Sequence, residues 1–153
     1  MYNTALRIVK VSQDAEEVMQ EAFLSAFEKI GEFRGKVRFG AWLKKIVVNK
    51  SLDHLRKKKI IFEELDKAGK DTITQDDPVE EESASLPDIQ SIREAVRTLP
   101  DGYRTILSLY LFEGYDHDEI AEILGISAVT SRTQYSRARK KLKEQLMKGK
   151  DHG

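Results

Sequence analysis

Five polar residues near the end of the chain have the types and spacing of a surface that recognises duplex DNA. They share one side of a predicted helix: Arg132, Thr133, Ser136, Arg137 and Lys140. Arginine can bond guanine through two parallel hydrogen bonds, short hydroxyls can reach base edges, and lysine can contact phosphate. Residues 127–150 carry eight Lys or Arg residues and one acid, Glu144. On charge alone, a solvated basic helix would be the better explanation of this face.

The residues just before this face predict the turn that presents it. Asp116 and Glu119 have capping-box spacing at the start of a short helix. Gly125 permits a left-handed turn, and Ser127 can cap the next helix. Two stripes are expected to pack inward: Ile120, Ala121, Ile123 and Leu124 on the first helix, then Ser131, Tyr135, Ala138, Leu142 and Leu146 on the second. This helix-turn-helix pattern favours groove binding over a merely solvated helix.

A second group of residues, in the first third of the chain, suits unpaired bases. Residues 31–40 (GEFRGKVRFG) interrupt the helical pattern and alternate cationic with aromatic side chains, which can support unstacked bases. Along one side of the next predicted helix lie Trp42, Lys45, Asn49 and Arg56. Trp42 by itself would more often be a core residue than a ligand-facing one. Residues 34–59 hold ten basic residues and one acid, so we expect phosphate contacts there. The candidate loop residues are Phe33, Lys36, Arg38 and Phe39.

The helix expected before this loop has two faces. Ser12 is predicted to cap it. Its inward stripe is predicted to be Ala15, Met19, Ala22, Ala26 and Ile30, widened by Phe23 and Phe27. The opposite face carries Glu17, Gln20, Glu21, Leu24 and Glu28. That face is either solvated surface or a protein-docking face with Leu24 as a small anchor.

Composition and charge predict an all-α protein of two small helical domains joined by a flexible acidic linker. The net charge of zero divides into +6 for residues 1–59, −8 for residues 60–90 and +2 for residues 91–153. We expect domains at 1–59 and 91–148, with the linker at 60–90. Helical patterning resumes at Ile89, and four helices are predicted in the second domain. Most of its core is expected from Ile106, Leu107, Leu109, Tyr110, Leu111 and Phe112.

Several classes of function are disfavoured. Without cysteine the chain has neither disulfides nor thiolate metal sites. His54, His117 and His152 lack ligand-like spacing, so we expect no metal and no cofactor. The carboxylates are not clustered as a nuclease would require, so we expect neither an enzyme nor a small-molecule substrate. No apolar run is long enough to span a bilayer and no signal pattern opens the chain, which favours the cytoplasm.

Both halves resemble a known family. LPDGYRTILSLYLFEGYDHDEIAEILGIS followed by SRARKKL resembles the promoter-reading C-terminal domain of bacterial sigma factors. EEVMQEAFLSAFEKIGEFRG followed by FGAWLKKIVVNKSLDHLRKKK resembles their N-terminal, polymerase-binding and promoter-melting domain. Two such domains and nothing else resemble the extracytoplasmic-function (ECF) class.

This resemblance implies a promoter-specificity subunit of RNA polymerase and a role for each group of residues. Glu17, Gln20, Glu21 and Leu24 match the face that docks on the clamp helices of the largest polymerase subunit. The loop from Phe33 to Trp42, with Lys45, Asn49 and Arg56, matches the part that captures bases of the melted minus-10 element. The polar face of the last helix matches the residues that enter the major groove at minus 35. An anti-sigma factor is the implied regulatory partner.

The chain departs from the family pattern in two places. Members have a further helix before a segment such as residues 2–9, so we expect a trimmed or downstream start. Ser131 stands where the family has Val or Ile. The alternative function is a stand-alone helix-turn-helix regulator with an N-terminal signal-binding or dimerisation domain, which predicts tight duplex binding at a palindromic site without polymerase.

Overall fold

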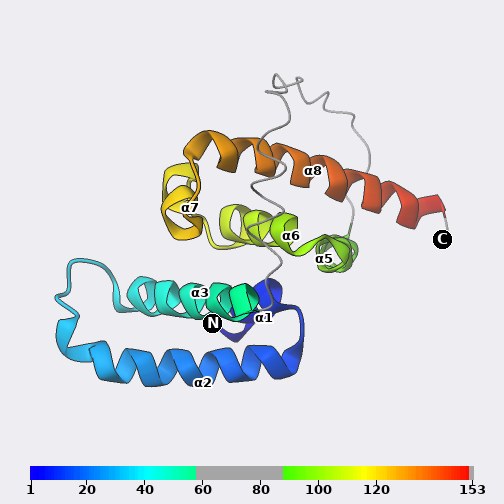
Figure 1. Ribbon diagram of the computed structural model, residues 1–153. Coiled ribbons are helices and arrows are strands. Elements are labelled where there is room, and N and C mark those ends of the chain that lie inside the picture. Colours follow the sequence, from blue (N-terminus) through cyan, green and yellow to red (C-terminus); the bar gives the residue numbers. More distant parts are fainter. Residues whose placement is uncertain (58–87, 152–153) are drawn as a thin grey trace. The chain divides into compact units, whose positions relative to one another are not determined.

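The computed structural model describes residues 1–57 and 88–151 (Figure 1). Every regular element within these ranges is helical, as the sequence predicts. The chain divides into two compact units, Met1–Phe62 and Glu63–Gly153. The predicted flexible linker lies outside the described residues except for its last three, where Asp88 caps a helix that begins at Ile89. None of the described helices has the length and apolar character that crossing a membrane requires.

In residues 1–57 the first unit packs three α-helices around one small core. These are α1 (Tyr2–Val9), α2 (Ser12–Lys29) and α3 (Phe39–Lys57), with a short 3-10 turn, η1 (Ile30–Glu32), after α2. Each α-helix contacts the other two, and α2 and α3 lie side by side in Figure 1. Their shared core contains Ala5, Ile8, Val18, Val47, Val48, Leu52 and Leu55.

Two predictions about α2 are wrong. Ser12 does not cap it, because Val11 occupies the N-cap position and Ser12 is the first helical residue. Phe23, Phe27 and Ile30 do not face inward but are 56%, 83% and 51% exposed. The buried face is instead a stripe of mostly small side chains: Ala15, Val18, Ala22, Ser25 and Ala26. Small side chains let α1 and α3 approach α2 closely, whereas phenylalanine at these positions would hold the helices apart.

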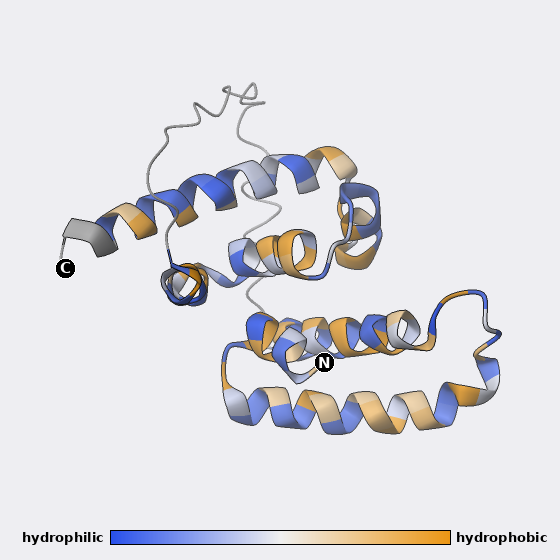
Figure 2. Cartoon of the chain, turned by 180° about the vertical axis from the view of Figure 1, so that it is seen from behind, coloured by the Kyte–Doolittle hydropathy of each residue, from blue (hydrophilic) through white to orange (hydrophobic). Residues whose placement is uncertain are grey.

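Within residues 88–151 the second unit has four helical stretches. They are α5 (Ile89–Thr98), α6 (Asp101–Leu107) continuing into the π-helical segment η2 (Ser108–Phe112), α7 (His117–Leu124) and α8 (Ala128–Asp151). The long helix α8 contacts α5, α6 and α7. Figure 2 shows α8 as mostly hydrophilic, whereas hydrophobic residues gather on α6 and η2. Hence α8 covers the core of this unit with one narrow side and leaves the rest of its surface to solvent.

The core prediction for this unit is right for Ile106, Leu107 and Leu109, which are buried, but wrong for Leu111 and Phe112, which are exposed. The π-helical turn explains the difference. Its wider i→i+5 spacing rotates the following side chains away from the direction that a regular helix would give them. Leu111 and Phe112 therefore leave the buried face.

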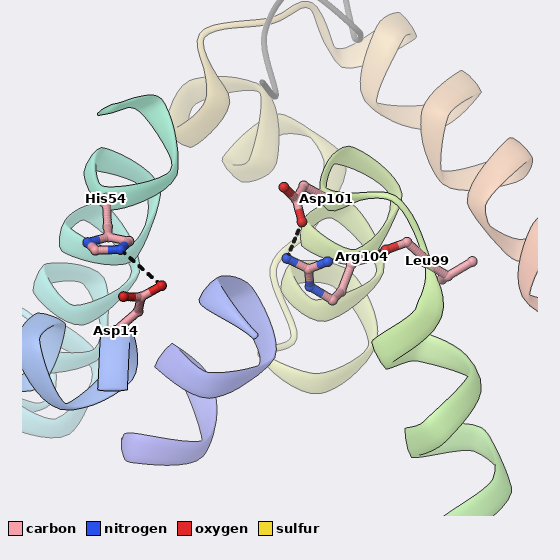
Figure 3. A network of polar contacts seen from close by, with 5 residues as sticks. All are labelled: Asp14, His54, Leu99, Asp101 and Arg104. Carbon is pink, nitrogen blue, oxygen red and sulfur yellow. Dashed lines mark hydrogen bonds and ion pairs between the residues drawn. The ribbon is translucent and has the colours of Figure 1, made fainter. Parts of the chain in front are cut away.

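A buried ion pair holds the turn between α5 and α6 (Figure 3). Arg104 is 2% exposed, and its Nη2 lies 2.6 Å from Oδ1 of Asp101. Its Nη1 donates a hydrogen bond to the carbonyl oxygen of Leu99 at 3.2 Å. A guanidinium withdrawn from water needs such partners, so this arginine ties the first turn of α6 to the end of α5.

Candidate nucleic-acid interface

The predicted helix-turn-helix is present with the local bonds that the sequence implies. Oδ1 of Asp116 accepts a hydrogen bond from the Glu119 backbone at 2.8 Å, and Oε1 of Glu119 accepts one from the Asp116 backbone at 3.2 Å. This capping box begins α7. Gly125 ends the helix in the left-handed conformation, with φ of 70°. A residue with a Cβ would be strained there, so the tight turn depends on this glycine.

The start of α8 is held by Ser127. Its Oγ accepts a hydrogen bond from the backbone nitrogen of Thr130 at 3.0 Å, as a capping residue does. The predicted inward stripe is confirmed, since Ser131 and Ala138 are buried and Tyr135, Leu142 and Leu146 are half-buried. The sequence interpretation missed Gln134, which is 1% exposed. Its position three residues after Ser131 could have indicated burial, but its polarity argued against it.

The polar face of α8 is accessible. Arg132, Ser136 and Lys140 are exposed, while Thr133 and Arg137 are half-buried. The Thr133 hydroxyl donates to the carbonyl oxygen of Val129 at 3.0 Å, which orients its methyl group and oxygen on the helix surface. Because the five residues recur at helical spacing, they line one side of α8 at the end nearest the turn. Burial lowers the pKa of His117 on α7, and the nearby charge of Arg132 lowers it further.

In the first unit three aromatic rings form a cluster at the end of the basic loop. The ring centroids of Phe33 and Phe39 are 5.7 Å apart, those of Phe33 and Trp42 are 5.3 Å apart, and those of Phe39 and Trp42 are 5.6 Å apart. Phe39 is exposed and the other two are half-buried. Trp42 is thus neither a core residue nor an isolated surface ring, but part of a partly open aromatic surface.

Cationic and polar side chains surround this cluster. Lys36 and Arg38 are exposed in the loop, and Lys45 and Asn49 are exposed on α3. Arg56 lies further along α3, where its Nη1 is 3.2 Å from Oδ1 of Asp53. Rings that can stack on bases therefore lie next to cations that can contact a phosphate backbone.

The predicted docking face on α2 is fully exposed. Glu17, Gln20, Glu21 and Leu24 all reach solvent, Leu24 with 66% of its surface. The unpredicted exposure of Phe27 adds a second large apolar side chain one turn further along. No cluster of three metal-binding side chains occurs in the described parts of the chain.

Comparisons with known proteins agree with this arrangement. Residues 1–60 match the family model for Sigma-70 region 2, and residues 89–142 match that for Sigma-70, region 4. The ECF RNA polymerase sigma factor SigW of Bacillus subtilis (strain 168) is 31% identical over 154 residues, covering 95% of this chain and 82% of SigW. RNA polymerase sigma factor SigV of the same strain is 32% identical over 150 residues, covering 96% of this chain and 84% of SigV.

A solved structure gives the same result. The sigma factor RpoE, in complex with the anti-sigma factor NepR from Bartonella quintana, matches with a TM-score of 0.64 and 25% identity, over 95% of this chain and 89% of RpoE. The resemblance seen in the sequence is thereby confirmed. The chain carries both sigma regions in order, one on each helical unit, and it belongs to the ECF family of RNA polymerase sigma factors, which are subunits for transcription initiation and not enzymes.

Proposed function

We propose that this sigma subunit holds promoter DNA at two places, with α8 in the major groove at minus 35 and the aromatic cluster on the melted strand at minus 10. The observation that carries the proposal is the pairing of two different surfaces in one chain. One is a polar, cationic helix face behind a capped turn, suited to duplex DNA. The other is a partly open aromatic cluster amid cations, suited to unpaired bases.

At minus 35, Arg132 and Arg137 bond base edges. Ser136 contacts bases through its hydroxyl group and Thr133 through its hydroxyl or methyl group, whereas Lys140 contacts phosphate. This division follows from the side chains, because the planar guanidinium of arginine matches the acceptor pair of guanine with two parallel hydrogen bonds, whereas lysine binds phosphate as a point charge. Arg132→Ala is expected to weaken recognition of one or two base pairs by about 1–3 kcal/mol each. Lys140→Ala is expected to weaken binding to all sequences about equally, since a phosphate contact carries no sequence information.

At minus 10, Phe33, Phe39 and Trp42 stack on bases that have left the duplex. Lys36, Arg38, Lys45, Asn49 and Arg56 bind the surrounding backbone and base edges. Stacking of a base on an aromatic ring is worth about 1–3 kcal/mol, comparable with the few kcal/mol that unpairing costs. The cluster thus offsets the cost of melting.

The exposed face of α2 docks on the clamp helices of the largest polymerase subunit. Glu17, Gln20 and Glu21 supply polar contacts around the apolar anchor Leu24. Residues 60–90 serve as a linker between domains at 1–59 and 91–148. An anti-sigma factor, the class of protein bound to RpoE, covers these surfaces in the inactive state, and the subunit works in the cytoplasm.

Run-off transcription with purified core polymerase, on promoters from the same genome, tests the proposal. The wild-type chain should direct initiation at specific promoters. Trp42→Ala should reduce strand opening, measured by permanganate reactivity of thymines, and leave minus-35 selectivity intact. Arg132→Ala should lower minus-35 selectivity and leave the strand opening of bound promoters intact. Tight binding to a palindromic duplex without polymerase, and no initiation with it, would instead establish the stand-alone regulator.

A further inference from the structure

The two helices of the helix-turn-helix are joined by a side-chain hydrogen bond. His117 is the first residue of α7, and its Nδ1 lies 2.9 Å from the hydroxyl of Ser131 on α8. Ser131 is 0% exposed and His117 is half-buried, so the serine hydroxyl is shielded from water. It directly precedes Arg132, the residue assigned to guanine recognition. The bond therefore acts where a small rotation of α8 would move the recognition face.

The imidazole of His117 is also fixed by two tyrosines from neighbouring elements. It stacks on Tyr110 of η2, with centroids 4.7 Å apart and planes 21° apart. It meets Tyr135 of α8 at 5.5 Å in an edge-on arrangement, and the two tyrosine rings are 4.3 Å apart. Three elements thus meet at this ring, and the stack on Tyr110 fixes the plane of the imidazole, in which Nδ1 reaches Ser131.

Ordinary hydrophobic packing does little to orient this part of α8. Between Ala128 and Arg137 the fully buried side chains are Ser131 and Gln134, a hydroxyl and an amide; the first fully buried apolar one is Ala138. Burial of apolar area is non-directional and tolerates rotation, whereas a hydrogen bond prescribes both distance and angle. Of the two, Ser131 makes such a directional contact, its bond to His117, and the orientation of the recognition helix depends on it.

We propose that His117 is a positioning residue for promoter recognition, which sets the rotation of α8 through its bond to Ser131 and its stack on Tyr110. Its role is to aim Arg132 at one base pair, without itself contacting the base. This inference rests on the proposed entry of α8 into the major groove. It makes His117 and Ser131 determinants of selectivity, although neither belongs to the exposed recognition face.

The test measures selectivity in open-complex formation by the full chain with core polymerase. The readout is the ratio of two rates of open-complex formation, one on the cognate promoter and one on a promoter changed at a single base pair. That base pair is the one whose recognition Arg132→Ala weakens. His117→Phe keeps an aromatic ring and removes Nδ1, and Ser131→Ala removes the hydroxyl. Each is expected to lower the ratio about fivefold or more, within the range that a good bidentate contact supplies. His117→Asn, which retains a polar group near the Nδ1 position, should restore part of it.

A double-mutant cycle separates positioning from mere stabilisation. In the Arg132→Ala background, His117→Phe should change the ratio by less than about twofold, because the two residues act through one contact. Ser91→Ala, which removes an exposed hydroxyl from α5, is the matched control and leaves the ratio unchanged.

Unchanged selectivity in both His117→Phe and Ser131→Ala, with only a lower melting temperature, would overturn the inference. So would an undiminished effect of His117→Phe in the Arg132→Ala background. If Arg132→Ala alters selectivity at no base pair, the proposed function of α8 fails, and the inference fails with it.

Discussion

Removal of Asp101 should destabilise the second unit strongly, because it takes away a carboxylate that pairs with the buried guanidinium of Arg104. The two side chains approach to 2.6 Å, and Arg104 is 2% exposed whereas Asp101 is 27% exposed. Breaking a buried ion pair by removing one partner typically costs 3–5 kcal/mol.

Two features of the structure reduce this cost. The Leu99 carbonyl still accepts a hydrogen bond from Arg104. The site of Asp101 is partly open, so water can take the place of its carboxylate beside the guanidinium nitrogen. We therefore expect Asp101→Ala to lower the free energy of unfolding by about 2–3 kcal/mol. For a unit of this size that corresponds to a fall in melting temperature of about 8–20 °C. Asp101→Asn keeps an acceptor oxygen and should lose less.

Urea unfolding of the full chain measures this effect with an internal reference. Far-UV circular dichroism follows the helices of both units, whereas fluorescence of Trp42, the single tryptophan, follows the first unit. The circular dichroism transition should move to lower urea while the Trp42 transition stays in place. Asp118→Ala is the matched control, because it removes a first-turn carboxylate from α7 and should cost about 0.3–1 kcal/mol. If Asp101→Ala costs no more than Asp118→Ala, the buried guanidinium does not depend on this carboxylate.

Three further predictions concern single residues. Lys10, between α1 and α2, has a positive φ of 73°, which glycine adopts without strain. Lys10→Gly should therefore stabilise the first unit by about 1 kcal/mol in Trp42-monitored unfolding, and Lys10→Ala should give no such gain. The buried Thr105 hydroxyl has no hydrogen-bond partner. Thr105→Val removes this hydroxyl, which should raise the free energy of unfolding by about 1 kcal/mol and with it the melting temperature of the second unit. A lower melting temperature would contradict this. Burial lowers the pKa of His117 below 6.5, aided by the charge of Arg132 and opposed by Asp116 and Asp118. The contribution of the neutral imidazole to stability is therefore complete above pH 6.5 and is lost as the pH falls below that value. An NMR titration of His117 with a midpoint at or above 6.5 would refute this prediction.

Local sequence determined the elements and the turn that presents the recognition face. The capping box of Asp116 and Glu119, the left-handed Gly125 and the Ser127 cap all form between residues at most four positions apart. Such bonds depend little on the rest of the fold, which is why their residue types and spacing predicted them correctly. The accessible face of α8 followed in turn, because helical periodicity places Ser131 and Arg132 on different sides of the helix, about 100° apart.

Only the tertiary structure decided which apolar side chains are buried and which polar ones join the core. On α2 either the small stripe or Phe23 and Phe27 could have faced inward, and the close approach of α1 and α3 selected the small stripe. The bond from His117 to Ser131 joins residues 14 positions apart, and the burial of Arg104 and Gln134 requires α8 to lie across the unit. Sequence periodicity defines the faces of a helix, but the helix that packs against it determines which face is buried, since burial is a property of the contact between them.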